Sequence, residues 1–281
     1  MRTRAFVALT TGALALTAVA VPAAHADDRP TGSALPFSSA SAAAAPGGPK
    51  ISNLSVNGGK VVIAGVSKKT FNIKFTAKDS DGIAFGIAAL WRGGPNADRA
   101  EKLLSIAEYT NPNNLCKRVD STTSTCTIKV LADPKAPISE GDLDNANAGR
   151  WNIAVYAEDK REKGTENQRY GTHYVKRAAT ATAKATPNPI KKGKTLTVAG
   201  SLTRANWDTN KYAGFAGQSV KLQYKKKGTD TWTTVKTVSS NSRGKVEAKA
   251  KATADGSYRF TYGGSTTTGS ASSKAAVVDV T

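Results

Sequence analysis

The sequence has few of the side chains that most often carry catalysis or bind metals. Its 281 residues include two histidines, two cysteines and one methionine. The histidines, His25 and His173, are too few for an HExxH motif or for a zinc site with several histidine ligands. A Ser-His-Asp triad would have to use His173, and the chain has no G-x-S-x-G segment. We therefore expect a protein that is not an enzyme.

Long apolar runs are absent except near the N-terminus. Phe6–Val21 is apolar, follows two arginines and precedes Ala24–Ala26, a small-x-small cleavage pattern. The run is short for a membrane span, and no later stretch is apolar enough to cross a bilayer. We expect residues 1–26 to be a signal peptide rather than an uncleaved anchor, and the mature protein to be secreted to the extracellular space, with no membrane span.

The two cysteines, Cys116 and Cys126, lie close together in the sequence. In an exported protein such an even pair indicates a disulfide. A redox or metal site would instead need Cys-x-x-Cys spacing or further ligands. We expect a bond that clips the loop over residues 111–124 to a strand and stabilises the fold by roughly 2–3 kcal/mol in the chain-entropy model.

Basic residues exceed acidic ones, 40 against 21, for a formal charge of +19. The excess is uneven, because residues 51–177 hold 19 basic and 14 acidic residues, and residues 178–281 hold 17 and 5. Such a field favours anionic partners. Outside the cytoplasm these are an anionic cell-wall polymer or polysaccharide. Nucleic acid is not expected, since no recognition helix or stacking motif is present.

Four lysines at alternating strand positions are candidates for an anion-binding surface. They are Lys221, Lys225, Lys249 and Lys251. If they shared one face, they would form a positive sheet that attracts extended polyanions. The other interpretation is that they are solvated faces or protect strand edges from unwanted pairing.

Period-two alternation predicts an all-β chain of two β-sandwich domains. Short alternating segments with Asp and Gly turns recur, and no βαβ rhythm occurs. The domains are expected at residues 51–177 and 178–281, after a disordered Ala/Ser/Pro-rich spacer over residues 27–50. Residues 178–188 should serve as linker and first strand of the second domain. The exception to the β pattern is Asp98–Tyr109, whose apolar spacing predicts a short helix.

Two segments carry a family resemblance. LTRANWDTNKYAGFAGQSVKLQYKKKGTDTWTTVKTV resembles a module of secreted actinobacterial proteins with a bacterial immunoglobulin-like sandwich, some of which are labelled calcium-binding. FTAKDSDGI and GRWNIAVYAEDK resemble the strand-end Asp motifs of immunoglobulin-like and cadherin-like extracellular modules. The resemblance implies that both β-sandwich domains are immunoglobulin-like and that the protein is extracellular, and it leaves function open.

Four acidic residues at two strand ends form the best candidate metal site. Asp79 and Asp81 follow one strand, and Glu158 and Asp159 end another. In an immunoglobulin-like sandwich the two strands run to the same end, so the four carboxylates would meet. Ca²⁺ takes six to eight oxygen ligands in flexible geometry. The other interpretation is that Asp79 and Asp159 cap turns through the backbone.

Three aromatic residues in one loop are a candidate ligand site. Trp207, Tyr212 and Phe215 lie between two alternating segments of Thr195–Lys225. Aromatic faces suit sugar rings, but large aromatics also plug the ends of sandwiches.

Together these features predict a secreted, non-catalytic binding or structural protein of the cell surface or extracellular space. No cofactor is certain from the sequence, and calcium is the one candidate. The alternative is a secreted hydrolase that uses carboxylates of the first domain on an extracellular polysaccharide, which the sequence alone leaves open. The ligand and the oligomeric state are not indicated.

Overall fold

The structure, a computed structural model, describes residues 47–104, 115–135 and 143–281. Within these residues, regular structure is β-strand apart from two short 3-10 turns, η1 (Asn57–Gly59) and η3 (Asn145–Asn147). No helix in the described ranges could span a membrane. The predicted signal peptide and nearly all of the predicted spacer lie outside these ranges and remain predictions.

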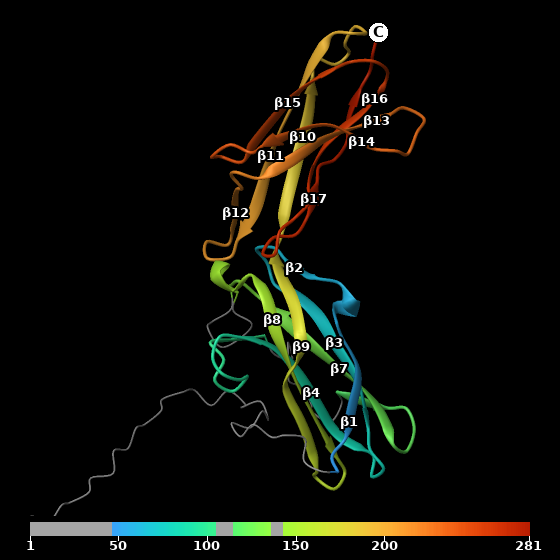
Figure 1. Cartoon of the computed structure of the whole chain (residues 1–281), viewed down its shortest axis with the longest axis vertical. Coiled ribbons are helices and arrows are strands. Elements are labelled where there is room, and N and C mark those ends of the chain that lie inside the picture. The colour runs from blue at the N-terminus through green and yellow to red at the C-terminus, as the bar shows by residue number, and fades with distance from the viewer. Residues whose placement is uncertain (1–46, 105–114, 136–142) are drawn as a thin grey trace, which may run out of the picture. The chain divides into compact units, whose positions relative to one another are not determined.

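Nine strands of the described residues build a first β-sandwich (Figure 1). They are β1 (Lys50–Val56), β2 (Val62–Ala64), β3 (Lys69–Lys78), β4 (Ile83–Arg92), β5 (Lys102–Leu104), β6 (Cys116–Arg118), β7 (Thr123–Ala132), β8 (Gly149–Asp159) and β9 (Gly164–Arg177). One sheet has the order β1-β3-β7-β6, and the other has the order β2-β9-β8-β4-β5. All pairs are antiparallel except β2 with β9.

This strand order is that of the immunoglobulin fold. There, strands A, B, E and D form one sheet, and C, F and G form the other. β1, β3, β7 and β6 take the places of A, B, E and D, while β4, β8 and β9 take those of C, F and G. The first sandwich is therefore immunoglobulin-like by topology.

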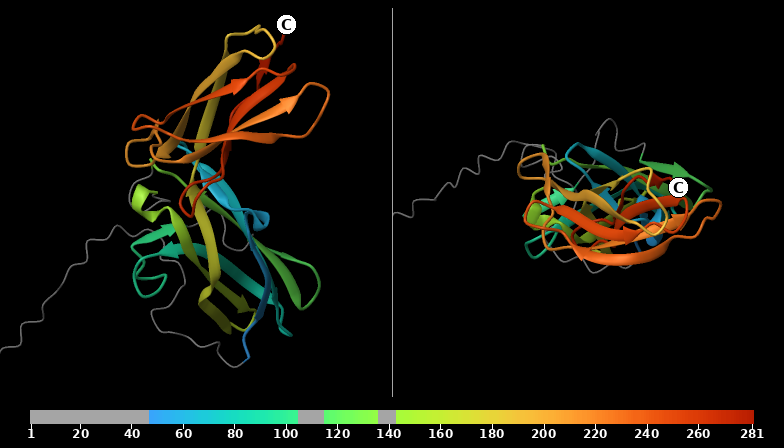
Figure 2. Two further views of the ribbon diagram at one scale, coloured as in Figure 1. Left: turned by 45° about the horizontal axis from the view of Figure 1, so that its top comes forward. Right: turned by 90° about the horizontal axis from the view of Figure 1, so that it is seen from above.

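Nine further strands build a second sandwich, coloured from yellow to red in Figures 1 and 2. They are β10 (Ala179–Thr186), β11 (Thr195–Asn206), β12 (Lys211–Gly214), β13 (Ser219–Lys226), β14 (Thr233–Ser239), β15 (Lys245–Lys251), β16 (Gly256–Tyr262), β17 (Ala271–Ser272) and β18 (Ala276–Val278). In one sheet β11 pairs with β10, β12 and β15. In the other, the order is β14-β13-β16, and both β17 and β18 pair with β16. The sheets again match A-B-E and C-F-G.

Alternation along the strands explains which residues form the two cores. Along β3 the side chains at 71, 73, 75 and 77 are buried, and along β15 those at 246, 248 and 250 are buried. β4 is buried on both faces near its end, with Trp91 1% exposed. The prediction of an all-β chain with two sandwiches is confirmed.

Two local predictions need correction. Asp98–Tyr109 does not begin as a helix, because Lys102–Leu104 is strand β5 and pairs with β4. Pairing to an open sheet edge outweighs the local helical spacing, and residues 105–109 lie outside the described ranges. Residues 178–188 do supply the first strand of the second sandwich, as expected, but they do not form a free linker, since β10 pairs with β11 along its whole length.

Candidate functional site

Three carboxylates meet at one end of the first sandwich. Asp79 and Asp81 lie in the turn after β3, and Asp159 is the last residue of β8. One carboxylate oxygen of each lies within 4.8 Å of the others. We call these three residues the acidic cluster. The structure thus brings together three of the four acidic residues that the sequence pattern selected.

The turn after β3 orients the first two members of the acidic cluster. Oδ1 of Asp79 accepts a hydrogen bond from the N–H of Asp81, 2.9 Å away. The carbonyl oxygen of Asp79 accepts another from the N–H of Gly82 at 3.1 Å. Gly82 has a φ of 78°, a conformation that glycine adopts without steric cost. Asp79 therefore caps its own turn, as one of the two interpretations expected.

Asp159 also caps a turn, as that interpretation expected, but capping accounts for only one of its two carboxylate oxygens. Its Oδ1 accepts hydrogen bonds from the backbone N–H groups of Arg161 and Lys163, at 2.8 and 2.9 Å. Its Oδ2 is buried and has no hydrogen-bond partner among the described residues. The residue is 0% exposed. A buried carboxylate oxygen without a partner is costly, because burial removes the water that would solvate its charge.

Among the described residues, one ion pair balances part of the negative charge of the acidic cluster. Nη2 of Arg161 lies 2.9 Å from Oδ1 of Asp81. The side chain of Arg161 is 70% exposed and that of Asp81 is 21% exposed. Such an exposed pair contributes little to stability and holds Asp81 only loosely. It leaves Asp159 Oδ2 without a partner.

Glu158, the fourth predicted member, does not join the acidic cluster. Neighbouring residues in a strand point to opposite faces, so Glu158 and Asp159 diverge. Oε2 of Glu158 accepts a hydrogen bond from the hydroxyl of Tyr156 at 2.5 Å. Burial, and then this hydrogen bond, raise the pKa of Tyr156. The structure thus corrects the predicted group, and the reason is the alternation of β8 itself.

Trp207 lies in the core of the first sandwich and not in a ligand loop of the second. Its side chain is 1% exposed and packs with the first core. Its indole Nε1–H donates to the carbonyl oxygens of Gly65 at 2.9 Å and Ala64 at 3.3 Å. The plug interpretation is correct for this residue, but the core that it fills belongs to the preceding sandwich.

The other two aromatic residues do not share a surface with Trp207. Phe215 is 8% exposed and packs in the second core, with its ring centroid 5.5 Å from that of Tyr262. The guanidinium of Arg204 lies 4.0 Å from the centroid of Phe215. Tyr212 is 42% exposed on β12. These different environments do not form the single sugar-binding loop that their spacing suggested.

The four candidate lysines lie on two different sheets. Lys221 and Lys225 are on β13, and Lys249 and Lys251 are on β15. β13 and β15 belong to opposite sheets of the second sandwich, and these lysines alternate with its buried residues. The two pairs therefore point away from each other and cannot form one positive surface. The reason is topological, since sequence alternation gives the side of a strand but not its sheet.

Sequence reasoning missed the surroundings of Lys225. The indole of Trp232 has the guanidinium carbon of Arg259 4.1 Å from its ring centroid and Nζ of Lys225 5.6 Å away. Lys225 and Trp232 lie in the hairpin of β13 and β14, and pairing of β13 with β16 brings Arg259 next to them. The one signal in the sequence was that Arg259 lies between two apolar residues of a strand, Tyr258 and Phe260, and so points to the outer face.

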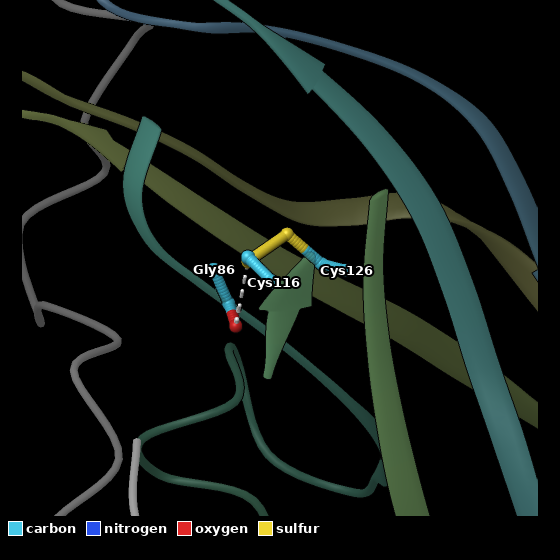
Figure 3. The surroundings of a disulfide bond; sticks show 3 residues. All are labelled: Gly86, Cys116 and Cys126. Carbon is cyan, nitrogen blue, oxygen red and sulfur yellow. Dashed lines mark hydrogen bonds between the residues drawn. A yellow bond between two sulfur atoms is a disulfide. The ribbon is translucent and has the colours of Figure 1, made fainter. Parts of the chain in front are cut away.

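The cysteines form the expected disulfide between β6 and β7 (Figure 3). Cys116 and Cys126 are direct partners in the antiparallel register. The Sγ of Cys116 lies 3.9 Å from the carbonyl oxygen of Gly86 on β4, in the facing sheet. The bond therefore joins two strands of one sheet and faces the other sheet, which is the position of a structural disulfide.

His173 shows no sign of a catalytic role. It is on β9, and its Nε2 lies 3.2 Å from the carbonyl oxygen of Lys60. Partial burial lowers the pKa of its imidazole, and the contact with Lys60 opposes that shift. In this contact a neutral imidazole donates from Nε2 to the backbone.

Comparisons with known proteins give a fold-level likeness. No family model matches the chain, and no curated protein matches it. Among solved structures it is similar to the D00–D0 domain of intimin, at 12% identity over 80% of this chain and 98% of that chain, with a TM-score of 0.27. It is also similar to a chain of the complex of Dpr2 Ig1–Ig2 with DIP-Theta Ig1–Ig3, at 15% identity over 83% and 98% of the chains, with a TM-score of 0.30.

A third similar structure is dimeric latent PorU from Porphyromonas gingivalis, at 13% identity with a TM-score of 0.28. The match covers 83% of this chain and 20% of that chain. TM-scores this low carry no argument about function. The assignment of an immunoglobulin-like fold rests on the strand order described above.

Proposed function

We propose that the protein is a non-catalytic binding or structural module of the extracellular space, and that the acidic cluster of its first sandwich binds Ca²⁺. The observation that carries the proposal is the buried, unpartnered Oδ2 of Asp159 beside two further carboxylates. Like charges held this close repel one another unless a cation lies between them. Calcium would offset that repulsion.

The geometry of the acidic cluster fits calcium. Ca²⁺ lies about 2.3–2.6 Å from its oxygen ligands, so two ligands of one ion are at most about 5.2 Å apart. The three carboxylate oxygens lie within 4.8 Å of one another. All are hard oxygen donors, which Ca²⁺ prefers, and water would complete its coordination.

A hydrolytic role for these carboxylates has less support. Glycosidases hold two carboxyl groups about 5–10 Å apart across a cleft that admits a sugar. The acidic cluster is tighter, and two hollows on the described surface lie elsewhere. One is lined by β3 residues such as Asn72 and Lys74, and the other by β10 and β15 residues such as Thr182 and Lys245.

The extracellular part of the proposal is supported by two independent features. The predicted export signal at residues 1–26 would deliver the chain to an oxidising compartment. The Cys116–Cys126 disulfide is of the kind that persists there.

Thermal unfolding of the full chain tests the calcium site. A ligand that binds only the native state stabilises it, by about 1.4 kcal/mol at ten times its Kd. We expect millimolar CaCl₂ to raise the melting temperature of wild-type protein. Asp159→Asn should remove this rise, because it replaces the unpartnered oxygen with an amide nitrogen. In buffer with chelator, Asp159→Asn should be at least as stable as wild type, since it removes an unbalanced buried charge.

Asp120→Asn is the matched control. Asp120 also caps a turn of the first sandwich, with its Oδ1 2.8 Å from the N–H of Thr122, but it lies outside the acidic cluster. This variant should keep the full calcium response. A wild-type melting temperature that calcium does not change would refute the site, as would an equal rise in Asp159→Asn. The carboxylate of Asp159 would then be a turn cap and not a calcium ligand.

A further inference from the structure

The outer face of one sheet of the second sandwich carries only positive charge. Strands β14, β13, β16 and β18 contain no Asp or Glu. Lys221, Lys225 and Arg259 lie on strand positions that alternate with the buried residues of β13 and β16. We call these three residues, together with Trp232, the cationic face.

Two of the three cations of the cationic face are held in place by neighbouring side chains, and none of the three has a counter-ion among the described residues. Arg259 lies over the indole of Trp232, 4.1 Å from its centroid, and its Nε–H donates to Oε1 of Gln223 at 2.8 Å. Lys225 lies 5.6 Å from the same ring. Cation–π contacts orient a positive group without neutralising it. Among the described residues, no ion pair involves Lys221, Lys225 or Arg259.

The three cations form a row along the strand direction. Lys221 and Lys225 are four residues apart on β13, which corresponds to about 13 Å at roughly 3.3 Å per residue. Arg259 is on the neighbouring strand, directly opposite Gln223, which lies midway between them. The strand positions that carry these cations therefore recur about every 6–7 Å along the face. This suits an extended polymer with repeated anionic groups better than a compact anion.

The opposite sheet lacks these properties. On β15, Glu247 interrupts the lysines at 245, 249 and 251, and no aromatic residue lies in that strand. The two faces of the second sandwich thus carry similar numbers of lysines in different settings. A comparison of the two faces can therefore distinguish binding at a specific surface from attraction to the net positive charge of the domain.

We propose that the cationic face binds an extended anionic polysaccharide. The cations would contact its carboxylate or sulfate groups, and the partly exposed indole of Trp232 would contact the apolar face of a sugar ring. The proposal rests on the extracellular location proposed above for access to such a polymer. Its binding test depends on neither that location nor calcium, so either proposal can fail alone.

Retention of the full chain on a heparin resin tests the surface. The variant Lys225→Gln/Arg259→Gln removes two charges from the cationic face, and Lys249→Gln/Lys251→Gln removes two from the opposite sheet. We expect the first variant to elute at clearly lower salt than wild type and the second to elute close to wild type. Equal shifts would overturn the proposal, because they would show attraction to net charge alone.

Tryptophan fluorescence of the wild-type chain supplies a second readout that needs no variant to fold. Trp91, Trp151 and Trp207 are each at most 1% exposed, so acrylamide should quench mainly Trp232. Added heparin should protect this fluorescence from quenching, and Trp232→Phe should remove the protected component. Unchanged quenching would contradict the proposal. Equal protection by a single-stranded oligonucleotide, or by anionic vesicles, would overturn the choice of a polysaccharide.

Discussion

His173 contributes to how the stability of the protein depends on pH near neutrality. Burial lowers the pKa of its imidazole below the ordinary 6.5. The unfolded chain therefore binds this proton more readily than the native chain does. The contribution of neutral His173 to the free energy of unfolding is therefore present above pH 6.5. It is lost as the pH falls through that value toward the lower native pKa.

We therefore expect the melting temperature of wild-type protein to fall between about pH 7.5 and about pH 5.5, and that of His173→Gln to fall less. Glutamine can still donate to the carbonyl oxygen of Lys60 but does not titrate. Parallel melting curves for the two proteins across this range would contradict the assignment. Calorimetry at several pH values makes the measurement.

The positions of single residues were predictable from the sequence where they follow from the strand that carries each residue. The convergence of Asp79, Asp81 and Asp159 follows from two strands that end at the same end of the sandwich. Glu158 was wrongly included, although alternation along β8 already separates it from Asp159. The environment of Trp207 could not be predicted, since its partners lie far away in sequence at residues 64 and 65.

At the scale of strands, the two sheets of the first sandwich pack closely where β4 passes the disulfide. A Cβ on Gly86 would lie 2.7 Å from Sγ of Cys126, 2.9 Å from Sγ of Cys116 and 2.9 Å from the ring of Phe75. No flexible side-chain end is available to move away. Only glycine lets β4 approach this close (Figure 3).

Gly86→Ala should destabilise the first sandwich by roughly 1–3 kcal/mol, the usual cost of overpacking a dense core. The matched control is Gly171→Ala on β9, where a Cβ would meet Cδ1 of Ile153 at an ordinary 3.7 Å. The control should be close to neutral. Urea unfolding measures both, and equal effects would show that the contact with the disulfide is not limiting.

Strands with clear alternation were predicted well, whereas short edge strands were not. β3, β8, β15 and β16 follow their patterns of buried and exposed residues closely. β5 was taken for part of a helix, because three residues are too few to show a period. The prediction that the four lysines share one surface was wrong for a related reason. Alternation places a side chain on one face of a strand but does not assign the strand to a sheet.

For the whole molecule, the boundary at residues 177 and 178 separates the two strand sets in sequence but not in packing. The boundary itself remains a proposal. The guanidinium Nε–H of Arg177 donates to the carbonyl oxygen of Ala205 at 2.6 Å, and the N–H of Ala178 donates to that of Ala64 at 2.8 Å. Burial, aided by repulsion from Arg204, lowers the pKa of Arg177 to about 10, so it stays charged near neutral pH.

Trp207 makes the first core depend on residues encoded in the second half of the chain. Trp207→Ala should destabilise the first sandwich by about 3–5 kcal/mol, because it leaves a large cavity and removes the hydrogen bonds that the indole donates to the carbonyl oxygens of Gly65 and Ala64. Hydrogen exchange should then quicken in β2, β8 and β9. The matched control is Phe215→Ala, which removes an aromatic ring from the second core and should quicken exchange in β13 and β16 instead. If Trp207→Ala leaves hydrogen exchange in the first sandwich unchanged, then the stability of the first core does not depend on Trp207, and the proposed dependence is wrong.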